Sequence, residues 1–172
     1  MLNTEDDVSK KNLFGAAFFG WYQHPASNEG VSILIDADGC PVVDIAVRLA
    51  KENNIKCLIL CDTAHVFEKD GAETINVLKG ADSVDFVLVN MVKKGDIVIT
   101  QDYGLAAMCL ARGALPINQD GMVYDSENID ALLMQRHMAK KIRMSGGRLK
   151  GNPKRTGEQD EMFEQILKKL LR

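Results

Sequence analysis

The sequence predicts one α/β domain, a three-layer fold with a parallel sheet and two further helices at the C-terminal end. Short apolar runs rich in β-branched residues alternate with longer helical segments along most of the chain. Several of these runs stop at an aspartate, and glycines follow the helical segments. A chain of 172 residues, 46% of them hydrophobic, has enough apolar material for one packed core.

Five strands are expected, at residues 31–35, 56–60, 74–77, 96–100 and 115–118. Three helices are expected between them, at 41–53, 82–94 and 103–112, with Pro41 suited to a first helical turn and Gly95 and Gly113 closing the other two. A long helix over 126–144, a basic connector and an amphipathic helix over 158–171 should follow, and Thr156 with Gln159 offers a capping box. Alternating strands and helices imply right-handed crossovers in a parallel sheet.

Residues 1–30 are expected to form an N-terminal extension to a domain over residues 31–172. The apolar run 13–22 is short, contains two glycines and follows acidic residues, which disfavours a signal peptide. It is interpreted as a partner-binding arm, an additional packed element or an extension from an upstream start. Four cysteines in a chain of this size predict free thiols in a cytoplasmic protein, with no disulfide framework, structural zinc site or membrane association. A homo-oligomer is left open.

Positive charge is concentrated near the C-terminal end. Residues 136–155 carry eight basic side chains and no acidic one. Such a stretch can neutralise phosphates of a nucleic acid, or it can be a solvated helix face and connector. Both interpretations stay open for these residues: Arg136, Lys140, Lys141, Arg143, Arg148, Lys150, Lys154 and Arg155.

Aspartates follow the ends of the predicted strands. Asp36 and Asp38 follow the first strand, and Asp102 follows the fourth, so all three should lie at the sheet edge where open parallel sheets bind ligands. Asp82 and Asp85 share one face at a helix start and can join them. Grouped carboxylates imply a cation or raised pKa values, and Mg²⁺ or Mn²⁺ is the natural occupant. As alternatives, Asp82, Asp85 and Asp102 can be helix caps.

Three motifs carry a family resemblance. IDADGCPV at 35–42, GADSVD at 80–85 and GDIVITQDYGLA at 95–106 resemble the YaiI/YqxD family of uncharacterised bacterial proteins, which is placed among PIN-like nucleases. The resemblance runs from about residue 31 to the C terminus and includes GMVYDSENI and GNPKRTGEQDEMF. It implies a PIN-like sheet with Asp36, Asp38, Asp82 or Asp85, and Asp102 as metal ligands. Gln101 stands where relatives typically carry a small residue, which predicts a narrower site.

The leading functional hypothesis is a ribonuclease or related phosphodiesterase that uses one or two Mg²⁺ or Mn²⁺ ions to activate water. Asp36 would be the central ligand, with Asp38 and Asp102 completing the catalytic group, and Asp82 or Asp85 would hold a second ion. Cys40 and Thr100 are candidates to support these ligands, and His65 is a candidate to touch substrate. RNA is the expected partner, and the residues predicted to contact it are Arg143, Arg148, Lys150, Lys154 and Arg155.

Two other functions compete with the nuclease. A haloacid-dehalogenase-like phosphatase would use Asp36 as nucleophile and Asp38 as acid and base, but the later acidic pair of such enzymes is poorly matched because Asp96 begins a strand. An RNA- or ribosome-associated binding protein would need no catalysis. If the carboxylates repel one another, replacing Asp36 or Asp102 with asparagine should raise stability in metal-free buffer.

Overall fold

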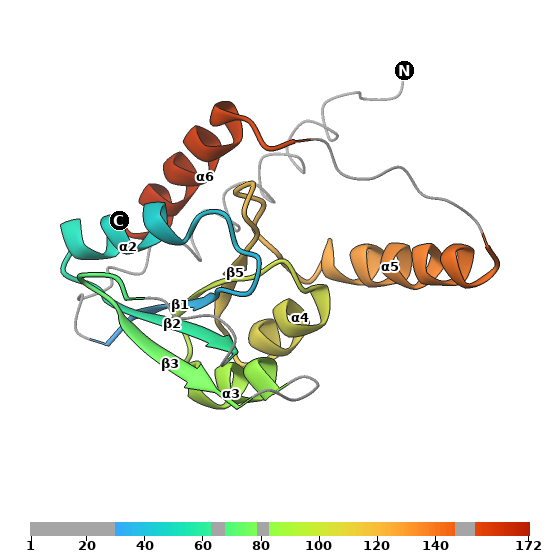
Figure 1. Ribbon diagram of the computed structural model, residues 1–172, viewed down its shortest axis with the longest axis horizontal. Coiled ribbons are helices and arrows are strands. Elements are labelled where there is room, and N and C mark those ends of the chain that lie inside the picture. Colours follow the sequence, from blue (N-terminus) through green and yellow to red (C-terminus); the bar gives the residue numbers. More distant parts are fainter. Residues whose placement is uncertain (1–29, 63–67, 79–82, 147–153) are drawn as a thin grey trace, which may run out of the picture.

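A computed structural model of the chain describes residues 30–62, 68–78, 83–146 and 154–172, so the predictions made for residues 1–29 lie outside it. Its five strands form one all-parallel sheet in the order β3-β2-β1-β4-β5 (Figure 1). The strands are β1 Ser32–Asp36, β2 Lys56–Asp62, β3 Glu73–Val77, β4 Ile97–Ile99 and β5 Leu115–Ile117. The helices are α2 Val43–Glu52, α3 Ser83–Met91, α4 Tyr103–Ala111, α5 Ile129–Met144 and α6 Gly157–Leu170.

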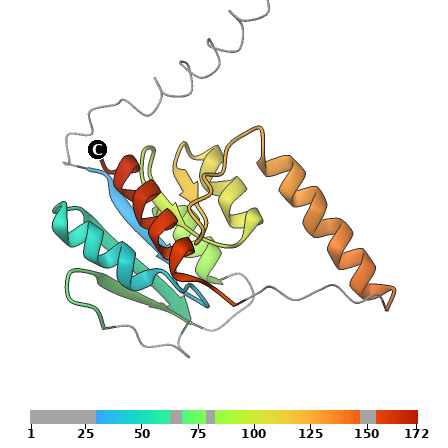
Figure 2. The ribbon, with the colours of Figure 1, turned by 90° about the horizontal axis from the view of Figure 1, so that it is seen from above.

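Helices cover both faces of the sheet, which confirms the predicted three-layer α/β fold. Side chains of β1 alternate between two cores because successive residues of a strand point to opposite faces. Ile33 and Ile35 pack with α2 and α6, whereas Leu34 packs with α3 and α4. The apolar runs of β1, β2 and β4 are therefore strands buried on both faces, as the lack of alternation predicted, whereas the edge strand β3 is partly exposed. Figure 2 shows α2 and α6 lying side by side on their face.

Element boundaries agree with the sequence patterns to within a few residues. Gly95 and Gly113 follow α3 and α4 with φ values of +89° and +78°, which glycine adopts without strain. Helix α2 begins at Val43, because Pro41 lies in the turn before it. Helix α5 begins at Ile129 and not at residue 126, since the Asp125 carboxylate accepts hydrogen bonds from the N–H groups of residues 127 and 128 and holds a turn there.

The two C-terminal helices are held in different ways. Helix α6 is part of the core, because Phe163 and Leu167 are fully buried among residues of α2 and the sheet. Its first turn has the predicted capping interaction, in which the Gln159 side chain accepts from the Thr156 N–H at 2.9 Å. Helix α5 packs at its start through Ile129 against a cluster that includes Ala106 of α4 and Tyr124, and then extends away from the sheet (Figures 1 and 2).

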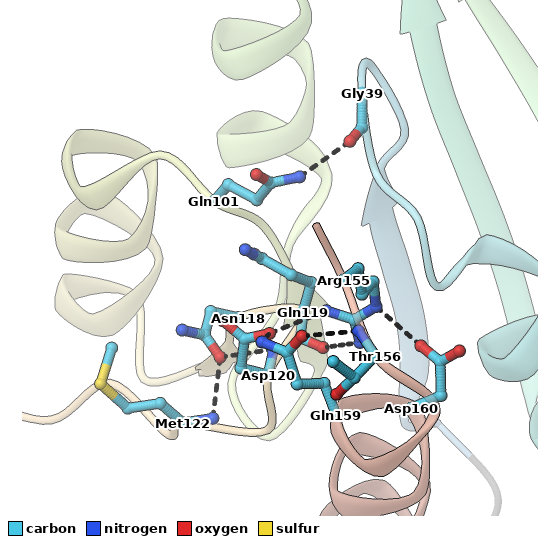
Figure 3. A network of polar contacts seen from close by, with 10 residues as sticks. All are labelled: Gly39, Gln101, Asn118, Gln119, Asp120, Met122, Arg155, Thr156, Gln159 and Asp160. Carbon is cyan, nitrogen blue, oxygen red and sulfur yellow. Dashed lines mark hydrogen bonds and ion pairs between the residues drawn. The ribbon is translucent and has the colours of Figure 1, made fainter. Parts of the chain in front are cut away.

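Arg155 anchors the chain before α6 to the loop that follows β5 (Figure 3). Its guanidinium donates to Asp120 Oδ1 at 2.7 Å, to Asp160 Oδ1 at 2.7 Å and to the Gln119 carbonyl at 2.6 Å. Asp120 Oδ1 also accepts from Gln159 of α6 at 3.1 Å. The side chain of Arg155 is 21% exposed. Its donors are thus used inside the protein, and not on an open surface as a phosphate contact requires.

Replacing Arg155 with glutamine should lower the free energy of unfolding by about 1 to 2 kcal/mol, because several charge-assisted hydrogen bonds are lost and two carboxylates lose their counter-charge. Lys154→Gln is the matched control, since Lys154 is an exposed neighbour of the same charge. Its effect should stay within about 0.5 kcal/mol. Urea denaturation of both variants measures the difference, and equal stabilities would contradict the anchoring role.

The remaining general expectations concern cysteines and membranes. Cys40, Cys57, Cys61 and Cys109 are all free thiols, as predicted, and all but Cys40 are buried. Among the described residues, the helices are too short or too polar to cross a bilayer.

Candidate functional site

The strand order places the candidate site. The chain runs outward from β1 through β2 to β3 and then returns to the other side of β1 with β4, so the order reverses between β1 and β4. Ligands of open parallel sheets bind in the crevice outside the carboxyl ends of the strands at such a point. A cavity of about 580 Å³ lies there. Its lining residues are Asp36, Asp38, Gly39, Asp62, Val84, Asp85, Gln101, Asp102, Tyr103 and Arg136.

Asp36 is the last residue of β1 and is mostly buried. Burial raises the pKa of its carboxyl to about 6, because the charged form loses its hydration. A hydrogen bond from Thr100 works in the opposite direction, and the negative charges of Asp85, Asp38 and Asp102 raise the pKa further. Burial is therefore the main cause of the raised pKa of Asp36, and the grouping of aspartates adds to it, in the direction that the sequence predicted.

Thr100 links the two strands that meet at the switch point. This buried residue follows β4, and its hydroxyl donates to Asp36 Oδ2 at 2.7 Å while accepting from the Asp102 N–H at 3.0 Å. The hydroxyl has one hydrogen, which it donates to Asp36. A lone pair of the same oxygen therefore accepts the hydrogen bond from the Asp102 N–H. The predicted supporting role of Thr100 agrees with this geometry.

Asp102 is the N-cap of α4, as its alternative interpretation proposed. Its Oδ1 accepts from the N–H groups of Gly104 and Leu105 at 2.7 and 3.1 Å, and Arg136 Nη1 lies 2.9 Å from each carboxylate oxygen. Burial acts to raise the pKa of Asp102, but these hydrogen bonds outweigh it and hold the pKa below its usual value. The expectation that neutralising Asp102 relieves repulsion is wrong, because the fold stabilises this charge.

The loop between β1 and α2 forms another wall of the cavity. The Asp38 carboxylate lies 3.3 and 3.4 Å from the backbone nitrogen of Asp62, which ends β2. Gln101 reaches across from the loop after β4 and donates to the Gly39 carbonyl at 2.9 Å (Figure 3). Gln101 therefore spans the mouth of the site and lines it, consistent with the narrowing predicted from its size.

The donor set suits a hard divalent cation in type. Asp36, Asp38, Asp85 and Asp102 present carboxylate oxygens to one cavity, and such oxygens are the ligands that Mg²⁺ and Mn²⁺ prefer. In the part of the chain that the structure describes, no three acidic, histidine or cysteine side chains converge closely enough to hold an ion. The guanidinium of Arg136 lies beside Asp102, where a metal ion bound by Asp102 would lie. The carboxylates are therefore suitable ligands for such an ion by type, but their side chains do not already surround one common point.

The other predicted site residues fall into three groups. Cys40 is half-buried, and burial raises the pKa of its thiol to about 11, so it is no nucleophile at neutral pH. Arg143 and Lys154 are exposed, whereas Arg155 has the internal partners given above. Asp82, His65, Arg148 and Lys150 lie outside the described residues.

Several lining residues were not among the predicted site residues, and three of them have ionisable side chains: Asp62, Tyr103 and Arg136. Asp62 ends β2 in the same way that Asp36 ends β1, so the pattern of strands ending in aspartate could have identified it. Tyr103 was expected to be the first residue of a helix, and nothing in the sequence indicated that its side chain would line a cavity. Arg136 was noted only as the first member of the basic stretch. Its contact with Asp102 depends on how α5 packs against α4, for which the sequence holds no local signal.

Comparisons with known proteins identify relatives of this chain. A family model described as "Uncharacterized BCR, YaiI/YqxD family" matches residues 34–172. The chain belongs to the YaiI/YqxD family. A UPF0178 protein of Exiguobacterium sibiricum is 52% identical over 141 residues, which cover 82% of this chain and 96% of that protein. UPF0178 proteins of Clostridium acetobutylicum and Alkaliphilus oremlandii are 46% and 50% identical over 143 and 137 residues, covering 82% and 80% of this chain and 97% and 88% of the relatives. No solved structure matches the chain.

The family match confirms the resemblance carried by the three motifs. It begins at residue 34, within β1, and therefore includes every described residue that lines the cavity. The all-parallel three-layer architecture is consistent with a PIN-like fold. The names of these YaiI/YqxD relatives specify no activity, so a function for this site has to be argued from its chemistry.

Proposed function

We propose that this YaiI/YqxD protein is a divalent-metal-dependent phosphodiesterase that hydrolyses RNA at the cavity between β1 and β4. The observation that carries the proposal is that four of the predicted carboxylates, from β1, the following loop, α3 and the start of α4, line one cavity at the switch point of the sheet together with Asp62 of β2. Like charges held together in this way are stable only with protons or a cation. The raised pKa of Asp36 supports the proposal in a secondary way, because burial is its main cause and the neighbouring carboxylates add to it.

A bound Mg²⁺ or Mn²⁺ would activate a water molecule and stabilise the leaving oxygen. The residues of the chain have separate tasks in this proposal. Asp36 and Asp38 would hold the ion from the β1 end, with Asp36 oriented by the Thr100 hydroxyl. Asp102, fixed by α4, would hold it from the other side, and Asp85 would contribute from α3. Arg136, once its place at Asp102 is taken, would be free to balance the charge of a phosphate.

The position of Asp96 favours this proposal over a phosphatase with Asp36 as nucleophile. A phosphatase of that type needs a pair of acidic groups after a later strand near the nucleophile, and in the described part of the chain Asp102 alone is present there. Asp96 instead lies at the amino end of β4, opposite the cavity, where its carboxylate accepts from the N–H groups of Ser32 and Lys93 at 2.8 Å each. Among the described residues that line the cavity there is also no lysine.

The ion pair between Arg136 and Asp102 is the observation that favours the second candidate, an RNA-binding protein without catalysis. In that function the pair would be permanent and would close the cavity to metals. The ion pair need not be permanent, because the Arg136 side chain is 52% exposed and a surface ion pair of this kind contributes little stability. A divalent ion that binds several carboxylates can replace it.

Cleavage of a labelled single-stranded RNA by the purified protein tests the proposal. Hydrolysis should require Mn²⁺ or Mg²⁺ and should stop when EDTA is added. The phosphatase alternative predicts instead a trapped aspartyl-phosphate analogue with beryllofluoride. RNA binding that is equal with and without metal, together with no turnover in Mn²⁺, would contradict the proposal and select the binding protein.

A further inference from the structure

A row of cations runs along α5 away from the cavity. Arg136, Lys140 and Arg143 are spaced four and three residues apart, so they share one face of the helix. Arg136 lines the cavity and lies 2.9 Å from Asp102, which identifies this face as the one turned toward the site. All three residues are exposed. From Ala131 to the end of the helix, α5 contains no acidic residue that could neutralise them. We call Arg136, Lys140 and Arg143 the α5 stripe.

The packing of α5 explains why the α5 stripe begins at the cavity. Ile129, Leu132 and Leu133 lie on the same helix face by spacing, and they pack against Tyr103 and Ala106 of α4. Beyond Leu133 the helix leaves the body of the protein, and the face that was apolar becomes cationic (Figures 1 and 2). Tyr103 lines the cavity as well as contacting this cluster. The same contact that fixes α5 therefore sets the start of the stripe beside the site.

The stripe supplies what the cavity lacks as a site for a phosphodiester. The five aspartates that line the cavity repel a polyanion, and Arg136 is the one cation among the described residues that line it. Along a helix, Lys140 lies about 6 Å and Arg143 about 10 Å beyond Arg136. The three cations therefore form a line about 10 Å long that begins at the cavity. A strand laid along the stripe would thus place one phosphate at the cavity and the next ones over Lys140 and Arg143.

We propose that α5 binds the backbone of a single-stranded nucleic acid through the α5 stripe and guides it to the cavity. This inference rests on the proposed function and names the route of its substrate. A second copy of the chain does not suit this surface, because two stripes of the same charge repel each other. The exposed apolar residues Met134, Met138 and Ile142 lie on the opposite face by spacing and have no part in the binding.

Salt-dependent binding in the absence of metal tests the stripe directly. The probe is a short labelled single-stranded RNA in buffer with EDTA, and the variant is Lys140→Gln with Arg143→Gln. Loss of two phosphate contacts should lower affinity on the order of tenfold near physiological salt and reduce the slope of log K against log salt by about 1.4. A single-stranded DNA should lose the same amount, because the stripe contacts phosphates and not the sugar.

The matched control is Lys141→Gln with Lys169→Gln, which removes the same charge. Lys141 lies about 100° around the helix from Lys140, and Lys169 is on α6. This control should keep the slope of the parent protein, and all variants should keep its unfolding midpoint. Equal slopes for both double variants, or tighter binding of a duplex than of a single strand, would overturn the stripe. If the protein cleaves RNA in Mn²⁺ but the stripe variant keeps the salt slope of the parent, only the role of the α5 stripe is refuted. If the stripe variant has the reduced slope but the protein does not cleave RNA in Mn²⁺, only the proposed activity is refuted.

Discussion

Asp36→Asn should reduce metal-dependent cleavage of RNA on the order of a hundredfold or more, because it removes the charge on the proposed central ligand. In metal-free buffer the same variant should be more stable than the parent at neutral pH. The pKa of Asp36 is raised from 3.8 to about 6, so the folded parent holds this proton more tightly than the unfolded chain does. The amide oxygen of the substituted side chain can still accept the hydrogen bond that Thr100 now gives to Asp36.

The direction of the pH effect follows from proton linkage. Between about pH 4 and pH 6 the folded parent binds more protons than the unfolded chain, so its free energy of unfolding falls as pH rises through this window. The full loss, roughly 3 kcal/mol for a pKa gap of this size, is present above about pH 7. Asp36→Asn should remove this loss and flatten the profile. Urea denaturation in EDTA at several pH values measures it.

Asp130→Asn is the control for net charge, since Asp130 is an exposed residue in the first turn of α5. It should keep the pH profile of the parent. If Asp36→Asn instead unfolds more easily than the parent at pH 8 without metal, the ionised Asp36 carboxylate stabilises the fold and its assignment to an ion site is contradicted.

Phe163→Ala should lower the free energy of unfolding by about 3 to 5 kcal/mol, the cost of removing a fully buried aromatic ring from a packed core. Phe163 has no exposed surface and packs with the core between α2 and the sheet. A loss of this size is a large fraction of the stability of an ordinary domain. Helix α6 would then be an essential part of the fold, although it is the last helix of the chain.

Met162→Ala is the matched control for Phe163→Ala, because Met162 is the preceding residue and is 52% exposed. Its effect should stay within about 0.5 kcal/mol. Urea denaturation of both variants gives the comparison. A loss below about 1 kcal/mol in Phe163→Ala would mean that α6 is only loosely docked on α2.

The parts of the fold that could be predicted from sequence are those with local causes. Apolar runs such as the one before Asp36 identify buried strands, and Gly113 directly follows the C-cap of α4 because glycine adopts positive φ without strain. Parallel strands then bring their carboxyl ends to one edge, so Asp36 and Asp102 were expected at the same edge. Their proximity also requires β1 and β4 to be neighbours, which the sheet order provides.

The partners of individual charges could not be predicted in the same way. Arg136 and Arg155 both belong to one basic stretch, yet one lines the cavity and the other is enclosed by Asp120 and Asp160. The difference arises from where α5 and α6 pack, which depends on contacts between distant segments. Composition identified the stretch, but only tertiary structure divides it into an anchor and an exposed α5 stripe.

The N-cap of α4 couples the end of this helix to the cavity, so a ligand bound in the cavity can be detected at the helix. The Asp102 carboxylate caps α4 and also lines the cavity. It lies so close to residue 104 that a Cβ there would be only 3.0 Å from Asp102 Oδ1, so glycine leaves room for this contact. When a ligand draws on this carboxylate, the hydrogen bonds from the Gly104 and Leu105 amides must change in strength. The amide resonances of these two residues will therefore shift on titration with Mg²⁺ or a small phosphate, so nuclear magnetic resonance can follow binding before any substrate is identified.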